Sequence, residues 1–93
     1  MKILAICKKK EDGKLLEHHL KSAIKAIGLI NIEVISRGTL PLKDDTANVY
    51  VMSRELASKC SLPNIVIVDD VMDYKDIKEK MIRLFSVYGI LKI

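Results

Sequence analysis

Short apolar runs alternate with segments of helical periodicity along the chain, and no other feature constrains the fold as much. Residues 3–7, 49–52 and 65–68 are continuous apolar runs, which are typical of strands buried on both faces of a parallel sheet. Residues 30–34 instead alternate apolar and polar side chains, which predicts a half-exposed strand at a sheet edge. The pattern therefore predicts four strands.

Helices are expected between and after these strands. Apolar residues recur at three- and four-residue steps within residues 16–27, and Gly28 is placed to close this helix at the C′ position. Ser53 is placed to cap a short helix that runs to about Lys59. Asp73 is placed to cap the last helix. The apolar face of that helix consists of Ile77, Met81, Leu84 and Phe85.

Because strand and helix alternate throughout, we predict one Rossmann-like α/β domain over residues 1–93. Its expected form is a three-layer α/β/α sandwich, with an open four-stranded parallel sheet in the order 2-1-3-4 and right-handed crossovers. The apolar residues 90–93 follow the last helix and are expected to dock on the sheet or on a neighbouring chain.

Composition narrows the classes of function. Of the 93 residues, 49% are hydrophobic and 30% charged, a globular mixture that excludes a disordered chain. The net charge is +4, but only three Tyr and one Phe are available to stack on bases, so no nucleic-acid partner is expected. No apolar run approaches the ~20 residues of a membrane span. Two cysteines without a metal spacing, and an N-terminus without a signal sequence, predict a cytoplasmic protein.

Cys7 is the strongest candidate for chemistry. It ends the first predicted strand, and ligands of open parallel sheets bind at the carboxyl ends of the strands. A short loop then leads into a helix N-terminus that favours an anion, with added positive charge from Lys8, Lys9, Lys10 and Lys14. We expect this field to favour the thiolate, so that a nucleophile and an anion site coincide. The alternative is a small buried hydrophobe followed by a solvated lysine run.

Other candidate residues have simpler structural interpretations. Cys60 lies away from the predicted loop and is expected to be structural. His18 and His19 are adjacent on a helix, so at most one faces the site, and surface positions are favoured over a role with phosphate. Asp69 and Asp70 end the fourth strand, where turn and cap chemistry is favoured over a metal or general-base role.

Several catalytic patterns are absent from the sequence. It contains no P-loop, no dinucleotide-binding motif and no His/Cys ligand cluster. A Cys-x5-Arg phosphatase loop would need an arginine where Gly13 stands. Lys14, one residue later, lacks the planar guanidinium that clamps a transferring phosphoryl group. Phosphatase activity is therefore not expected.

Three segments together resemble a known family. Residues 1–7 resemble the opening of the IIB components of the sugar phosphotransferase system (PTS), of the ascorbate and galactitol type, which share a lactose/cellobiose-like IIB fold. Residues 48–57 resemble the third strand and short helix of that family. Residues 65–73, followed by Ile77, resemble its fourth strand and the acidic, Met-containing turn into the last helix.

The resemblance implies a cytoplasmic phosphocarrier. Such a protein accepts a phosphoryl group from a phosphohistidine of a IIA partner, holds it on the cysteine that ends the first strand, and passes it to a sugar bound by a membrane IIC partner. The matching residue is Cys7, whose thiolate would form a covalent thiophosphate without a metal or organic cofactor. The phosphate-binding positions would be Lys8, Lys9, Lys10, Gly13 and Lys14.

The segment after Cys7 departs from the family pattern. The family has a glycine-rich loop ending in serines that wraps the phosphate, whereas residues 8–14 contain one glycine, no hydroxyl and the acidic pair Glu11 and Asp12. Either the lysines substitute charge for the backbone cradle, or the chain is a non-catalytic IIB-like regulatory or docking domain. A basic anion- or nucleic-acid-binding domain unrelated to sugar transport is a third interpretation.

Overall fold

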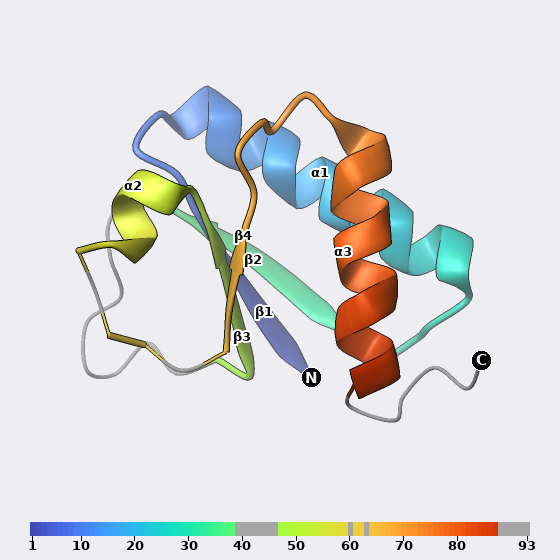
Figure 1. The fold of residues 1–93 in the computed structure, drawn as a ribbon. Helices are drawn as coiled ribbons and strands as arrows, with labels where there is room; N and C mark the ends of the chain where they lie inside the picture. The colour runs from blue at the N-terminus through green and yellow to red at the C-terminus, as the bar shows by residue number, and fades with distance from the viewer. Residues whose placement is uncertain (39–46, 60, 63, 88–93) are drawn as a thin grey trace.

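The computed structural model describes residues 1–38, 47–59, 61–62 and 64–87, and its strands and helices alternate as predicted (Figure 1). The order is β1 (Lys2–Ile6), α1 (Lys10–Ile27), β2 (Glu33–Arg37), β3 (Val49–Met52), α2 (Arg54–Ala57), β4 (Ile65–Ile67) and α3 (Tyr74–Val87). The C-terminal residues 90–93 and Cys60 lie outside the described residues.

All strand pairs are parallel, and the sheet order β2-β1-β3-β4 confirms the predicted order. In the register, Ala5 of β1 stands opposite Ser36 of β2 and Val51 of β3. Because the strands run the same way, their carboxyl ends meet at one edge of the sheet. The residue after β1, Cys7, therefore lies at that edge together with the ends of β2, β3 and β4.

The layers follow from the alternation of side chains along each strand. Ile3, Ala5 and Cys7 point to the face covered by α1 and α3, whereas Leu4 and Ile6 point to the opposite face, which α2 covers in part (Figure 1). The predicted α/β/α arrangement is confirmed, with unequal layers: α1 has 18 residues and α2 only four.

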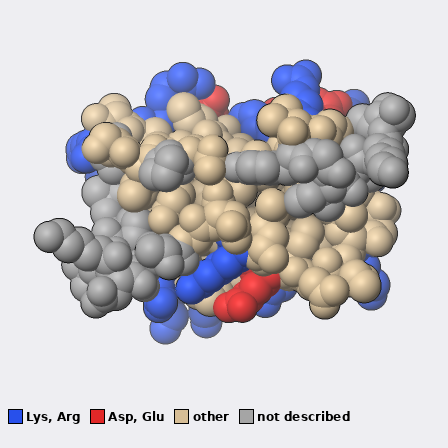
Figure 2. Space-filling model, turned by 90° about the horizontal axis from the view of Figure 1, so that it is seen from below, with Lys and Arg blue, Asp and Glu red and all other residues tan. Residues whose placement is uncertain are grey.

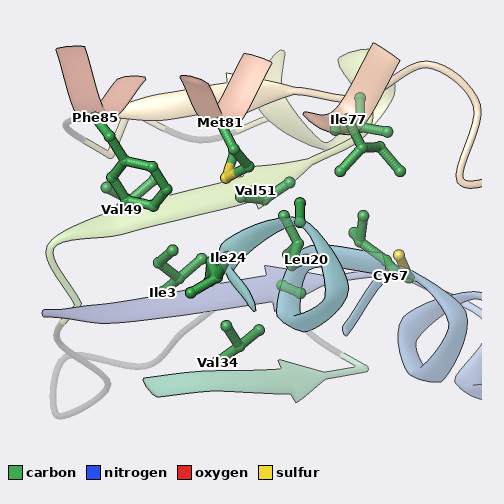
Figure 3. Close-up of a cluster of buried hydrophobic side chains, with 14 residues drawn as sticks. Ile3, Cys7, Leu20, Ile24, Val34, Val49, Val51, Ile77, Met81 and Phe85 are labelled. Atoms are coloured by element: carbon green, nitrogen blue, oxygen red, sulfur yellow. The ribbon is translucent and has the colours of Figure 1, made fainter. Parts of the chain in front are cut away.

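The larger core lies between the sheet and the two helices α1 and α3. Ile77, Met81 and Phe85 follow one another at every fourth position of α3 and point onto Val49 and Val51 of β3 (Figure 3). All five side chains are completely buried. Burial of a side chain of this size stabilises the folded state by roughly 1.5–3 kcal/mol. The apolar face predicted for the last helix is thus the face that packs on the sheet.

The predicted helix caps are present. Gly28 ends α1 with a φ of 90°, and its N–H donates to the carbonyls of Ile24 and Lys25, both at 3.1 Å. The Ser53 hydroxyl oxygen accepts from the Leu56 N–H at 3.3 Å at the start of α2. The Asp73 carboxylate accepts in the same way from Asp76 N–H at 3.1 Å, before the first turn of α3.

The second strand lies three residues further along the chain than predicted. β2 spans Glu33–Arg37, not residues 30–34, and Ile30 is 81% exposed. Asn31 has a φ of 62° and turns the chain toward the sheet, so that pairing begins only where the Glu33 N–H donates to the Met1 carbonyl at 2.9 Å. The edge position itself is confirmed, because among the described strands β2 pairs with β1 alone.

Much of the described surface on the side shown in Figure 2 consists of residues other than Lys, Arg, Asp and Glu. Seen from below, most Lys and Arg side chains lie along the borders of this face, and one basic and one acidic side chain lie side by side in its lower middle. None of the helices in the described part of the chain is long and apolar enough to cross a membrane.

Candidate functional site

Cys7 lies directly beyond β1, at the carboxyl edge of the sheet. Its N–H donates to the Arg37 carbonyl at 3.1 Å, which extends the β1–β2 pairing by one residue. The residue is 8% exposed and packs in the core cluster beneath α1 and α3. Only Lys8 and Lys9 separate it from the first residue of α1, Lys10. The position of Cys7 is therefore fixed by β1 on one side in the sequence and by α1 on the other.

One of the two clefts that meet at Cys7 is basic, and we call it the basic pocket. It has a volume of about 320 Å³ and lies between the carboxyl ends of β1 and β2. Within the described residues its lining contains no carboxylate. It is lined by Cys7, Lys8, Lys10, Gly13, Lys14, Ser36, Arg37 and Gly38. Four cationic residues, Lys8, Lys10, Lys14 and Arg37, thus line the pocket beside the thiol.

The other cleft is the acidic cleft, which has a volume of about 430 Å³ and extends from Cys7 toward the ends of β3 and β4. Its charged lining consists of Lys8, Lys9, Asp12, Glu55, Asp69 and Asp70. Open parallel sheets bind ligands where the strand order reverses, which here is the β1–β3 side. That side is acidic, so the structure favours anions on the neighbouring β1–β2 side.

The segment after Cys7 forms a helical turn and not a wrapping loop. α1 begins at Lys10, and the Gly13 N–H donates to the Lys9 carbonyl at 3.0 Å, so this amide is already occupied. Gly13 lines the basic pocket, and a Cβ there would lie 3.8 Å from the Cβ atoms of both Cys7 and Ser36. The geometry therefore does not support the predicted role of the Gly13 amide in binding phosphate.

Of the six site residues selected from the sequence, five line the basic pocket and one does not. Cys7, Lys8, Lys10, Gly13 and Lys14 are brought together there, whereas Lys9 lines only the acidic cleft.

The pKa of the Cys7 thiol is raised, not lowered. Burial is the larger cause, because the low-polarity surroundings disfavour the thiolate, and the negative charge of Asp12 adds to it. The expectation of a thiolate favoured by the helix N-terminus and the lysines was therefore wrong. The alternative interpretation of Cys7 as a small buried residue agrees with its place in the core, whereas the sequence did not reveal that Asp12 on the first turn of α1 opposes its ionisation.

Lys8 is engaged by α2. Its Nζ lies 2.6 Å from Oε1 of Glu55, and the Nζ of Lys59 lies 3.6 Å from the same oxygen. The contact with Glu55 raises the pKa of Lys8, and the contact with Lys8 lowers the pKa of Glu55. Both side chains therefore remain charged at neutral pH.

Ser36 and Arg37 are site residues that sequence reasoning missed. Both belong to the last part of β2, and they line the basic pocket. The Ser36 N–H donates to a carboxylate oxygen of Glu17 at 3.1 Å, which ties the strand end to α1. A prediction that the second strand ends at Arg37 would have identified both residues, because parallel strands end at a common edge of the sheet.

The two histidines lie outside both clefts. His19 is partly buried, its Nδ1 lies 2.9 Å from the Val71 carbonyl oxygen, and its ring meets Tyr74 edge-on at a centroid distance of 5.5 Å. His18 is exposed. The prediction that at most one of them faces the site is confirmed, because neither lines a cleft. The favoured surface position holds for His18, whereas His19 is partly buried against the loop after β4.

The acidic pair after β4 has structural partners. The Asp70 carboxylate accepts from the Met72 N–H at 2.9 Å, which confirms the turn interpretation. Asp69 forms an ion pair with Arg54 at 3.3 Å. Across the part of the chain that the structure describes, no group of three or more His, Cys, Asp or Glu side chains could hold a metal ion.

No family model, curated protein or solved structure matches the chain.

Proposed function

We propose that the chain is a phosphocarrier of the PTS IIB type, with Cys7 as the residue that carries the phosphoryl group. The observation that supports this most is the basic pocket, in which the thiol shares a lining with Lys8, Lys10, Lys14 and Arg37 and with no described carboxylate. A phosphoryl group carries a charge of about −2 at neutral pH and binds best where cations surround it.

The transfer step must account for the thiol proton as well as for the phosphoryl group. The Cys7 sulfur attacks phosphorus, the S–P bond forms, and the N–P bond of the donor phosphohistidine breaks with its electron pair left on the imidazole nitrogen. That nitrogen takes up a proton, and the thiol gives one up. A thiol that is protonated at rest is therefore compatible with the overall exchange, in which a neutral thiol becomes a thiophosphate and a neutral histidine is released.

The cations would neutralise the phosphoryl oxygens during the transfer. Lys10 and Lys14 are one helical turn apart on α1 and border the same pocket, so they act from one side. Arg37 acts from the strand on the other side, and its planar guanidinium is suited to two phosphoryl oxygens at once. Charge from side chains would thus replace the backbone cradle of the family, and no metal or organic cofactor is needed.

The same proposal supplies the partners. A cytoplasmic IIA protein with a phosphohistidine would be the donor, and a membrane IIC protein would hold the acceptor sugar, of the ascorbate or galactitol kind. The carrier itself then binds only phosphoryl groups and protein surfaces.

The alternative is a non-catalytic IIB-like domain that regulates or docks on a partner. The raised pKa of Cys7 and the helical turn that takes the place of the phosphate loop favour this alternative. In that case the basic pocket is a remnant or a contact surface, and the fold alone carries the function.

Incubation with a phosphorylated IIA protein separates the two. The carrier proposal expects a mass increase of one phosphoryl group that Cys7→Ser abolishes and Cys60→Ser leaves intact. A donor that phosphorylates an authentic IIB protein but leaves this chain unmodified would refute it. The docking alternative expects capture of a IIA or IIC protein that persists in Cys7→Ser, and loss of capture in that variant would count against it.

A further inference from the structure

Lys8 stands at the boundary between the two clefts, but its charged end is held outside the basic pocket. The residue lines both the basic pocket and the acidic cleft. Its Nζ lies 2.6 Å from Oε1 of Glu55, which lines the acidic cleft and not the basic pocket. The cation next to Cys7 in the sequence is therefore occupied by a carboxylate of α2.

This ion pair is built to exchange partners. The two side chains are 57% and 64% exposed, and ion pairs at such exposure are weak and easily screened by salt. Glu55 also has Lys59 at 3.6 Å, so its carboxylate keeps a cationic neighbour when Lys8 leaves. Lysine carries its charge on a flexible four-carbon stem, which suits a movement between two anions on either side of Cys7.

We propose that Glu55 is a positioning residue that withholds Lys8 from Cys7 until an anion enters the basic pocket. The proposal rests on the function proposed above, in which that anion is the phosphoryl group carried by Cys7. A phosphoryl group of charge about −2 competes successfully with the single charge of Glu55, and Lys8 then moves to the phosphoryl oxygens. Occupancy of Cys7 thereby changes the ion pairs on the first turn of α2.

Two alkylating reagents test this without any phosphoryl donor. In a Cys60→Ser background, the rate of Cys7 modification is measured with anionic iodoacetate and with neutral iodoacetamide at the same pH. Both rates depend in the same way on the pKa and the burial of the Cys7 thiol, so these effects cancel in the ratio. The ratio therefore reports the charge near the sulfur. Glu55→Gln is expected to raise the iodoacetate-to-iodoacetamide ratio about twofold, because Lys8 is released. Lys8→Gln is expected to lower it by a similar factor.

The double variant decides whether Glu55 acts through Lys8. In a Lys8→Gln background, Glu55→Gln should leave the ratio unchanged. Glu33→Gln is the matched control, because Glu33 lies at the amino end of β2, at the end of the sheet away from Cys7. It should have no effect in either background. An equal rise with and without Lys8, or no rise in Glu55→Gln, would overturn the proposal. Since no donor is present, that outcome leaves phosphorylation of Cys7 undecided, and a failed phosphorylation leaves this result standing.

Discussion

Gly13 on the first turn of α1 packs directly against Cys7: a Cβ at position 13 would lie 3.8 Å from the Cys7 Cβ. The first turn of α1 therefore lies close to the residue that follows β1. A separation of 3.8 Å is an ordinary van der Waals contact, and the residue lies within α1 without a positive φ. The site therefore tolerates a methyl group at this position.

Gly13→Ala should therefore stabilise the protein. Alanine loses less backbone entropy than glycine when a helix forms, and the expected gain in the free energy of unfolding is about 0.5–1 kcal/mol, measured by urea denaturation. Gly28→Ala is the matched control at the other end of α1. Gly28 has a φ of 90°, so its substitution should cost about 1–2 kcal/mol although nothing lies near its Cβ position. Destabilisation by Gly13→Ala would show that the contact with Cys7 is tighter than the structure indicates.

The Cys7 thiol should titrate above the pH at which an ordinary cysteine does. Burial and the charge of Asp12 both oppose the thiolate, so both raise the pKa. In a Cys60→Ser background, the iodoacetamide rate plotted against pH should have a higher midpoint for the folded protein than for the protein unfolded in urea. Asp12→Asn should lower that midpoint only in part, because burial is the larger cause. A folded midpoint at or below the unfolded one would contradict the assigned causes.

His19 should contribute to stability, and its neighbour should not. His19→Ala removes the contact of Nδ1 with the Val71 carbonyl at 2.9 Å and the ring contact with Tyr74. The expected loss is about 1 kcal/mol in the free energy of unfolding. His18 is exposed, so His18→Ala should change stability by less than about 0.5 kcal/mol. Equal losses in urea denaturation at pH 8 would argue against the packing of α1 on the loop after β4.

Lys80 should stabilise the end of β4 at the edge of the sheet. Its Nζ donates to the Ile67 carbonyl at 2.6 Å and lies 3.0 Å from an Asp76 carboxylate oxygen. Lys80→Met keeps the length of the side chain but leaves that carbonyl without its donor, which should cost about 0.5–1.5 kcal/mol in urea denaturation. Lys75→Met, on the same helix at an exposed position, should be nearly neutral. A neutral Lys80→Met would show that water replaces the ammonium without loss.

The sequence was sufficient for the architecture because buried parallel strands have an unambiguous pattern. The runs around Leu4, Val51 and Val66 have no polar residue in them, and each is a strand. The second strand was misplaced because an edge strand shows only alternation, and the alternating pattern of residues 30–34 begins in the turn that precedes the strand. The positive φ of Asn31, which separates turn from strand, follows from the path of the chain and not from its composition.

The candidate site was predictable in its residues but not in its electrostatics. Cys7 and the lysines are close in sequence, so their proximity needs no tertiary information. The partner of Lys8, by contrast, is 47 residues away, and the thiol pKa depends on which side chains bury Cys7. Arg37 reaches the site only through strand pairing with β1. Sequence reasoning therefore recovered the local part of the basic pocket and missed the part contributed by the sheet.

Inorganic phosphate should bind the basic pocket weakly, and the affinity should depend on Lys14. If phosphate binds only the folded chain, ten times its dissociation constant should stabilise the protein by about 1.4 kcal/mol, which appears as a rise in the midpoint of thermal unfolding. Lys14→Gln removes a cation from the pocket lining and should weaken binding by a factor of about 2–5. Lys25→Gln, on the last turn of the same helix and away from the pocket, should not. A chloride solution of equal ionic strength is the control that separates phosphate binding from charge screening. Equal responses of the two variants to phosphate would mean that phosphate does not bind beside Cys7.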